Sequence, residues 1–411
     1  MAGELLEVGV LFAAVALVGA LARRINQSVI PFYIVAGTLL SGFVAGRLTE
    51  DLLGQSYAVG QSAEATHFIE IGAELGIVFL LFFLGLEFNL DRLLANREKI
   101  GAVGLIDFGV NFSAGLVVGY LLFGSFLPAF IVAGMVYISS SAIITKSLID
   151  LGWIANDESG PLLGTLVFED LFIAVYLAVL SALVVGGGDV SAAAVSVGVG
   201  IGFILLLLAV VALGAGFFRR VLATDSHEFT VLRVAGVTVL VAGAALAVNV
   251  SEAVAAFFIG MAFSSTGKAE DLENLLEPVR DIFGAIFFFW IGLVTDPALF
   301  GDVLALIAVA AVATTPTKLL SGFWSGKVYG LSDRRSTRVA LGIVTRGEFT
   351  LIIAATALTV TDSAALSADV ARELNAFAVG YVLVMSILGT MLMQYSGVFE
   401  DRVARWRGEG G

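Results

Sequence analysis

Cysteine is absent from the sequence, and histidine occurs only at His67 and His227. The absence of cysteine excludes disulfide bonds and thiolate metal sites, and two histidines do not make a histidine-rich metal centre. Charged residues make up only 14% of the 411 residues, whereas about a quarter of a soluble domain is charged. The phosphate-binding motif G-x-x-x-x-G-K-[ST] is missing as well, which argues against an ATP-driven pump. The sequence therefore excludes a soluble domain and gives no reason to expect a cofactor or an enzymatic activity.

Long hydrophobic runs take up nearly the whole chain. Hydrophobic residues make up 59% of it, and the mean hydropathy is +0.99. The apolar runs are about 20 residues long, which is the length that a helix needs to cross a bilayer. Because the runs are continuous rather than alternating, they predict helices and not the strands of a barrel. We therefore expect an all-α polytopic membrane protein with about 13 transmembrane helices.

The positions of the basic residues predict how these helices are oriented. Most of the 22 lysines and arginines fall in loops on one side of the membrane, and cytoplasmic loops carry an excess of such residues. The sequence thus predicts a multi-pass protein of the cell membrane with its N-terminus outside and its C-terminus in the cytoplasm. We expect a transmembrane domain over residues 1–395 and a short cytoplasmic tail over residues 396–411. The predicted spans are residues 4–22, 28–47, 68–88, 100–123, 126–148, 160–185, 191–217, 229–249, 251–267, 275–295, 300–324, 336–358 and 373–395.

Two adjacent carboxylates, Glu169 and Asp170, interrupt the apolar run of the sixth span. One charge at membrane depth costs at least about 2.5–3.5 kcal/mol, so intramembrane acids usually have a function. Consecutive helical residues point about 100° apart, so the two acids cannot face one spot equally. We predict that Asp170 binds the ion directly and that Glu169 faces the site more obliquely or pairs with a basic group. The alternative is that both acids only join helices.

Hydroxyl side chains interrupt the span before the two acids. Ser139, Ser140, Ser141 and Thr145 lie in an otherwise apolar segment, and such hydroxyls can compete for backbone hydrogen bonds. A broken helix exposes backbone carbonyls and amides that suit a small ion site. A continuous helix that uses small residues for close packing is the alternative interpretation.

A second interruption lies in the twelfth span, where Arg346 and Glu348 stand among apolar residues. Interrupted helices at corresponding places in two halves indicate an inverted-repeat transporter. The fourth to sixth spans would then correspond to the eleventh to thirteenth. Arg346 could stabilise the dipole ends of the crossing helices, and Glu348 could either form a local ion pair with it or serve transport.

The eleventh span contains one lysine well inside the membrane, Lys318, and the fourth contains Asp107 and Asn111. Lys318 could extend toward the cytoplasmic surface. It could instead be a buried cation that neutralises one of the intramembrane acids, in a pair that breaks and re-forms as ions exchange.

Six motifs in a fixed order resemble those of monovalent cation:proton antiporters, most closely the Kef-type potassium/proton branch. The resemblance covers nearly the whole chain. It implies a core bundle and a dimerisation bundle, with two discontinuous helices that cross near the carboxylates. The family's essential aspartate matches Asp170, and its core lysine matches Lys318. Glu169 departs from the Gln, Asn or Asp that is usual before that aspartate. The motifs are ELGIVFLLFFLGLEFNLDRL (74–93), ISSSAIITKSL (138–148), VFEDLFIAVYLAVL (167–180), SEAVAAFFIGMAFSST (251–266), PVRDIFGAIFFFWIGLVTDP (278–297) and TRGEFTLIIA (345–354).

The resemblance and the residues together predict a secondary active antiporter, with K⁺ as the favoured cation and Na⁺ as the second candidate. A carboxylate and several hydroxyl or carbonyl oxygens suit a dehydrated alkali cation. Asp170 would bind the cation or a proton, but not both at once. A ligand-gated cation channel and a membrane sensor are the competing interpretations. The resemblance also implies a homodimer and, in some relatives, a separate cytosolic regulatory subunit.

Overall fold

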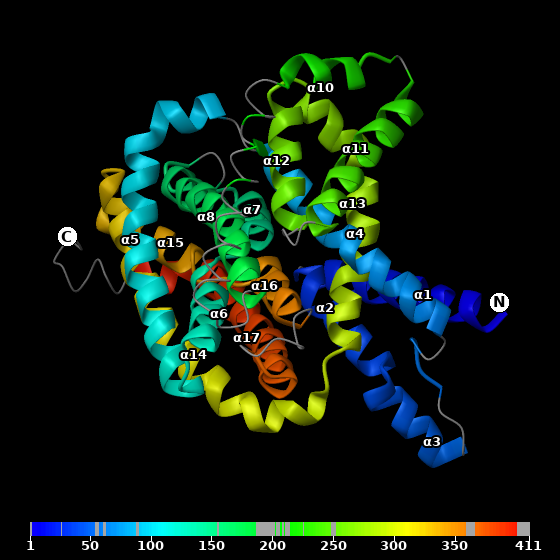
Figure 1. Cartoon of the computed structure of the whole chain (residues 1–411). Coiled ribbons are helices and arrows are strands. Elements are labelled where there is room, and N and C mark those ends of the chain that lie inside the picture. The colour runs from blue at the N-terminus through cyan, green and yellow to red at the C-terminus, as the bar shows by residue number, and fades with distance from the viewer. Residues whose placement is uncertain are drawn as a thin grey trace. The chain divides into compact units, whose positions relative to one another are not determined.

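The computed structural model describes residues 2–25, 27–53, 57–60, 63–87, 90–153, 156–185, 214–224, 226–247, 252–358 and 366–400, together with residues 202, 206, 207 and 209. All regular structure in this part of the chain is helical (Figure 1). The chain folds into two compact units. Unit 1 comprises mainly residues 1–92 and 174–297, and unit 2 comprises mainly residues 93–173, 298–362 and 366–411.

Unit 1 contains the N-terminal helices and those of the middle of the chain. They are α1 (Ala2–Arg24), α2 (Val29–Leu40), the short π-helix η1 (Gly42–Gly46), α3 (Arg47–Leu53), α4 (Ala63–Glu87), α10 (Ala215–Val221), α11 (His227–Ala247), α12 (Glu252–Ser264) and α13 (Ala269–Leu293). The helix α8 (Ser159–Val185) begins in unit 2 and ends in unit 1.

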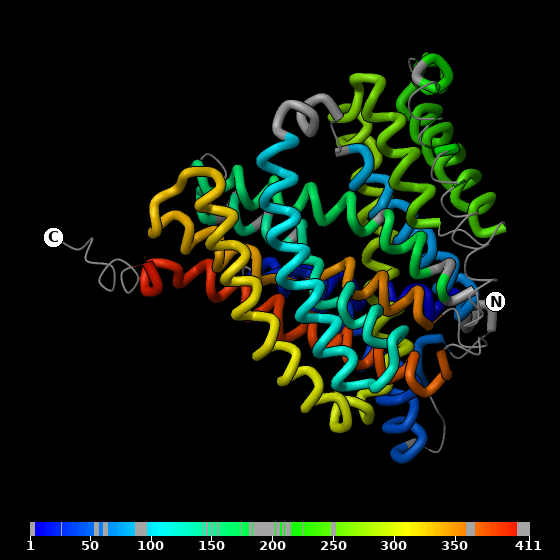
Figure 2. The backbone as a smooth tube through the Cα atoms, turned by 60° about the vertical axis from the view of Figure 1, so that its left-hand side comes forward, coloured from blue at the N-terminus to red at the C-terminus, as the bar shows by residue number. Residues whose placement is uncertain are grey.

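Unit 2 contains the remaining helices, traced by the tube in Figure 2. They are α5 (Leu90–Phe123), α6 (Phe126–Tyr137), α7 (Ser141–Asp150), α14 (Phe300–Val328), α15 (Asp333–Gly342), α16 (Glu348–Leu358) and α17 (Ala368–Gln394). The short 3₁₀ turn η2 (Pro297–Leu299) leads into α14.

The described helices confirm a polytopic membrane protein. Eight helical stretches among the described residues are long and apolar enough to cross a bilayer, and α6, α12 and α16 are shorter apolar helices. Most of the predicted seventh span, residues 191–217, lies outside the described residues, as do residues 401–411 of the predicted tail. The count of 13 spans therefore stays a prediction.

Paired glycines bring helices of unit 1 into backbone contact. A Cβ atom on Gly85 of α4 would lie 1.9 Å from the carbonyl oxygen of Phe257 on α12, and one on Gly260 of α12 would lie 2.0 Å from the carbonyl oxygen of Phe82 on α4. Helices in membranes associate through such small residues, because they let the backbones approach closely. The contact is reciprocal, so neither helix can accept a side chain there without moving its partner.

We therefore expect Gly260→Ala to destabilise the protein by about 1–3 kcal/mol, the usual cost of overpacking. The melting temperature of the detergent-solubilised protein measures this loss. Gly243→Ala is the matched control, since a Cβ atom on Gly243 of α11 meets nothing within 4 Å. The control should be neutral or slightly stabilising, because alanine favours helix over glycine by about 1 kcal/mol. Equal melting temperatures for the two variants would show that the α4–α12 contact tolerates a methyl group.

Unit 2 repeats one order of elements. A long helix, an interrupted helix and a second long helix occur as α5, α6–α7 and α8, and again as α14, α15–α16 and α17. The first interruption falls at residues 138–140, and the second at residues 343–347. This confirms the two discontinuous helices and the correspondence between the fourth to sixth and eleventh to thirteenth spans. The alternative of a continuous helix through residues 126–148 is wrong.

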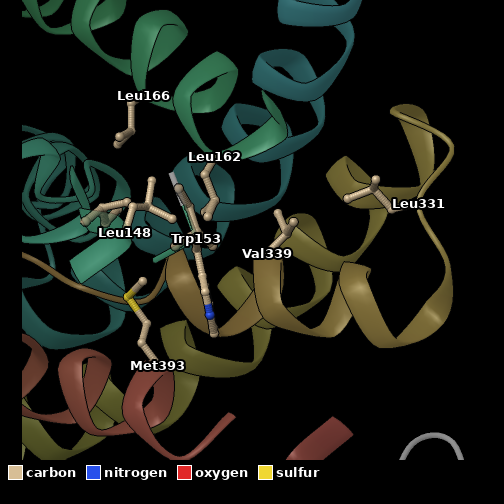
Figure 3. Packing of buried hydrophobic residues seen from close by; sticks show 9 residues of the cluster. Leu148, Trp153, Leu162, Leu166, Leu331, Val339 and Met393 are labelled. Atoms are coloured by element: carbon tan, nitrogen blue, oxygen red, sulfur yellow. The ribbon is translucent and has the colours of Figure 1, made fainter. Parts of the chain in front are cut away.

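An apolar cluster joins α7, α8, α15 and α17 within unit 2 (Figure 3). It places half-helices of both interrupted spans, α7 and α15, in one packed core. Its members include Trp153, just after α7, Val339 of α15 and Met393 of α17. The remaining members are Ile144, Leu148, Leu162, Leu166, Leu331 and Ile343.

A charged cluster links the end of unit 2 to α15. Residues 396–400, at the start of the predicted tail, are helical, and the buried carboxylate of Glu400 accepts hydrogen bonds from Arg338 Nε at 2.7 Å and Arg334 Nε at 2.7 Å. Arg338 also donates to Glu158, before α8, at 2.8 Å. Burial alone would raise the pKa of Glu400, but the hydrogen bonds and charges of Arg338 and Arg334 outweigh it and hold that pKa below its ordinary value.

This lowered pKa predicts a pH-dependent effect of Glu400→Gln. A carboxyl whose pKa falls on folding stabilises the protein above its unfolded pKa of about 4.3, and this stabilisation is lost as the pH falls through the folded value. We expect Glu400→Gln to cost about 1–3 kcal/mol at neutral pH and progressively less as the pH falls below about 4. Melting temperatures measured across that range, with the exposed Glu98→Gln as control, test this. A loss that does not change with pH would contradict it.

Candidate ion-binding site at two interrupted helices

The two interruptions meet backbone to backbone. The amide of Ser140, before α7, donates to the carbonyl of Thr345, before α16, at 3.1 Å. The Oγ of Ser139 lies 3.1 Å from the carbonyl oxygen of Ile343. A Cβ atom on Gly347 would lie 2.4 Å from Ser140 Oγ, so the contact requires glycine there. Hydrogen bonds that regular helices would make internally are thus made between the two interrupted segments.

Arg346 donates hydrogen bonds to carbonyls at the C-terminal ends of the interrupted helices. The side chain is fully buried, and its Nε donates to the carbonyl of Val136, near the end of α6, at 2.9 Å. Its Nη1 donates to the carbonyls of Val344, Thr345 and Ile343 at 2.8, 3.1 and 3.3 Å. The last carbonyls of a helix carry partial negative charge and lack partners within the helix. Arg346 therefore contacts carbonyls at the C-terminal ends of α6 and α15.

Glu348 lies at the N-terminal end of a half-helix, where backbone amides and not carbonyls lack partners. It is the first residue of α16, and its carboxylate accepts from Ser140 Oγ at 2.7 Å and from Ser141 Oγ at 3.1 Å, at the start of α7. A carboxylate is stabilised at a helix N-terminus, where the amides carry partial positive charge. Glu348 and Arg346 thus compensate opposite ends of the four half-helices.

Glu169 is fully buried and accepts hydrogen bonds on both carboxylate oxygens. The backbone amide of Ser139 donates to its Oε2 at 2.7 Å, and the hydroxyl of the same residue donates to Oε1 at 3.0 Å. Lys318 of α14 donates to Oε1 at 2.6 Å. Glu169 therefore joins α8 to the first interruption and to α14, and it pairs with a basic group, one of the two predicted arrangements.

Lys318 is a buried cation between two carboxylates. Its side chain is 0% exposed, and its Nζ lies 2.6 Å from Glu169 Oε1 and 2.7 Å from Asp107 Oδ2. The same nitrogen lies 5.1 Å from the ring centroid of Tyr137, at the end of α6. The alternative in which Lys318 extends to the cytoplasmic surface is therefore wrong.

Asp107 was not among the predicted site residues, although it lies on the fourth span, which the sequence relates to the eleventh span that contains Lys318. On α5, its Oδ1 accepts from Asn111 Nδ2 at 2.8 Å and from Ser321 Oγ of α14 at 2.6 Å. These two helices lie side by side in Figure 2, in cyan and yellow. Two signals could have identified the site: the i, i+4 spacing of Asp107 and Asn111, and the i, i+3 spacing of Lys318 and Ser321.

Asp170 follows Glu169 on α8 and is 8% exposed. Because consecutive helical residues point about 100° apart, the side chains of Glu169 and Asp170 leave α8 in different directions. Among the predicted hydroxyls, Ser139 and Ser140 are buried and Ser141 is partly exposed. Thr145 belongs to α7, and its side chain lies outside the described residues. At the second interruption, the buried Thr345 Oγ1 has no hydrogen-bond partner, which leaves one oxygen able to ligate a cation.

The geometry defines a class of protein: a membrane carrier whose buried charges lie where two interrupted helices meet. Comparison with known proteins gives the same class. Residues 10–394 match the family described as sodium/hydrogen exchanger, transmembrane. The chain therefore belongs to the transmembrane sodium/hydrogen exchanger family, whose members include monovalent cation:proton antiporters.

Two curated relatives align over most of the chain. The K⁺/H⁺ antiporter subunit KhtU of Bacillus subtilis is 34% identical over 407 residues, which cover 98% of this chain and 96% of the relative. The ammonium/H⁺ antiporter subunit AmhT of Alkalihalophilus pseudofirmus is 28% identical over 383 residues, covering 90% and 94%. The solved structure of the sodium proton antiporter MjNhaP1 from Methanocaldococcus jannaschii at pH 8 has a TM-score of 0.71 at 13% identity, covering 94% of this chain and 99% of that one. This last likeness supports the fold.

Proposed function

We propose that this chain is a secondary active antiporter that exchanges a monovalent cation for protons by alternating access, with K⁺ favoured and Na⁺ as the second candidate. The observation that carries the proposal is the buried group formed by Glu169, Lys318 and Asp107, next to Asp170 and at the junction of two interrupted helices. The names of the relatives support the choice of cation, since one is a K⁺/H⁺ antiporter subunit and another an ammonium/H⁺ antiporter subunit.

Asp170 is the group for which the cation and the proton compete in this proposal. A cation that leaves water needs several oxygen ligands. Ser139 and Ser140 donate their hydroxyl protons to Glu169 and Glu348, and a hydroxyl that donates keeps lone pairs with which it can ligate. A carboxylate that holds neither ion carries an uncompensated charge, and moving it through the membrane is costly. Either loaded form is cheaper to move, and this difference couples the two fluxes.

The same proposal extends to the assembly. We propose a homodimer in the cell membrane, with the N-terminus outside and the C-terminus in the cytoplasm. The positive-inside distribution of Lys and Arg supports this orientation. A separate cytosolic regulatory subunit is supported by the fact that both curated relatives are called subunits.

Proteoliposomes that contain a pH-sensitive dye test the function. Addition of K⁺, Na⁺ or NH₄⁺ to vesicles with an imposed pH gradient should release protons in a saturable manner, with K⁺ the most effective. Protein-free vesicles correct for the passive passage of ammonia. Cation movement without coupled proton flux would replace the antiporter with the channel alternative, and no cation movement at all would leave a sensor or scaffold.

A further inference from the structure

One carboxylate receives two hydroxyl protons where the half-helices α7 and α16 begin. Glu348 is the first residue of α16 and is 5% exposed. Its Oε2 accepts from Ser140 Oγ at 2.7 Å, and its Oε1 accepts from Ser141 Oγ at 3.1 Å. An ionised carboxylate has no proton and can only accept hydrogen bonds. Each of the two serines therefore gives its single hydroxyl proton to Glu348.

Ser140 is also held by three neighbours other than Glu348. Its Oγ accepts from the amide of Ile143 at 3.3 Å, the bond that a helix-capping serine makes. Its own amide donates to the carbonyl of Thr345 at 3.1 Å, and a Cβ atom on Gly347 would lie 2.4 Å from its Oγ. A serine hydroxyl has two lone pairs. One of them faces the Ile143 amide, which leaves one for a ligand.

The direction of a hydroxyl proton decides whether the hydroxyl can bind a cation. A hydroxyl ligates a cation through a lone pair, and a proton that points at the cation repels it. A serine hydroxyl turns toward whichever acceptor is within reach. For both Ser140 and Ser141 that acceptor is Glu348, so one carboxylate fixes the direction of two protons.

We propose that Glu348 is a positioning residue that makes Ser140 and Ser141 ligands of the transported cation by accepting both of their hydroxyl protons. The inference rests on the proposed antiport and deepens it, because it names a residue that sets cation affinity without contacting the cation. This role goes beyond compensating helix dipoles, which a carboxylate at these helix ends does wherever the serine protons point.

Glu348→Gln keeps the size of the side chain but replaces one acceptor oxygen with an NH₂ donor. Whichever way the amide lies, one of the two serines then accepts a hydrogen bond in place of donating one. That serine loses a lone pair, and its own proton becomes free to point toward the cation. If the NH₂ group faces Ser140, both lone pairs of that hydroxyl are taken, because Ile143 already uses one.

Equilibrium binding of radioactive rubidium, as an analogue of K⁺, to the detergent-solubilised protein tests this role. K⁺-driven proton exchange in proteoliposomes gives the KM for K⁺ and the maximal rate. We expect Glu348→Gln to weaken rubidium binding and raise the KM by about tenfold, with a maximal rate within about twofold of wild type, since the loss amounts to about one hydrogen bond. Glu252→Gln is the matched control, because Glu252 is also the first residue of a helix, α12. It should leave rubidium binding and KM unchanged.

A variant of Ser141 separates the direction of the protons from the charge of Glu348. In Ser141→Ala, the amide of Glu348→Gln can turn its carbonyl oxygen to Ser140 and accept that proton as glutamate does. Glu348→Gln should then cost less than about twofold in rubidium affinity when it is added to Ser141→Ala. A loss of about tenfold in both backgrounds would show that Glu348 acts through its charge or as a ligand, and would overturn the proposal.

The remaining outcomes are equally distinct. Wild-type protein that neither binds rubidium nor exchanges K⁺ for protons overturns the proposed function itself. Unchanged rubidium affinity in Glu348→Gln overturns the positioning role alone. If Glu348→Gln does not fold, Glu348→Asp replaces it, since aspartate keeps the charge at the helix ends but is one carbon too short to reach both serines from the same position. Wild-type rubidium affinity in Glu348→Asp would then refute the positioning role.

Discussion

Replacing Asp170 with asparagine is expected to abolish cation-driven proton exchange, with a loss of at least about 100-fold, since about 2.7 kcal/mol of lost cation binding suffices for that factor. The amide keeps the size of the side chain and one carbonyl ligand but can neither bind a titrating proton nor supply the charge that offsets dehydration of the cation. Because Asp170 is only 8% exposed, water cannot easily take the place of the lost carboxylate ligand. Initial rates of dye response in proteoliposomes, normalised to the amount of inserted protein, measure the effect.

The control for this prediction is Asp302→Asn, since Asp302 is an exposed acid at the start of α14. It should exchange at the wild-type rate. Glu169→Gln should slow exchange less than Asp170→Asn. If Asp170→Asn were to transport normally while Glu169→Gln did not, the cation would bind at the buried group of Lys318 and not at Asp170.

Replacing Lys318 with methionine is expected to destabilise the protein by about 3–5 kcal/mol, the usual result of removing one partner from a buried ion pair. Methionine fills a similar volume, so the loss reports the charge and not a cavity. The variant leaves Glu169 and Asp107 buried without their shared ammonium. Protonation of these acids relieves the repulsion, so the loss in melting temperature should be smaller in acid than at alkaline pH.

Lys99→Met is the matched control, because Lys99 is exposed. Its ammonium lies 5.1 Å from the ring centroid of Tyr329. Its melting temperature should stay near that of wild type. The double variant Lys318→Met/Glu169→Gln should recover part of the lost stability, since it removes one of the two unpaired carboxylates. If Lys318→Met cost no more than Lys99→Met, the buried pair would contribute no net stability.

The sequence predicted the positions of the interruptions well, because residues that break a helix leave a direct local signal. Serines in an apolar run marked the first interruption, and Arg346, Gly347 and Glu348 marked the second, within a few residues of the observed helix ends. The comparison between the two halves of unit 2 followed from the same signals.

The pairing of Lys318 could not be predicted with the same certainty. Its partners lie 149 and 211 residues away in the chain, and burial against distant helices decides whether a lysine extends to the surface or stays inside. The surface alternative was therefore reasonable from sequence and wrong in the structure. Asp107 was noted as polar but not as part of the site, because one residue does not reveal which helix will cover it.

The charges at the ends of the half-helices have a consequence for handling the protein. Arg346 binds carbonyls at one kind of helix end and Glu348 lies at the amide ends. The protein's own side chains therefore supply the counter-charges that a bound ion would otherwise provide. A carrier with these internal counter-charges should keep its site folded when no substrate ion is bound. It should tolerate purification in buffers free of its substrate, and ligand screens based on thermal shift should give small signals, whereas direct flux assays report the ion it carries.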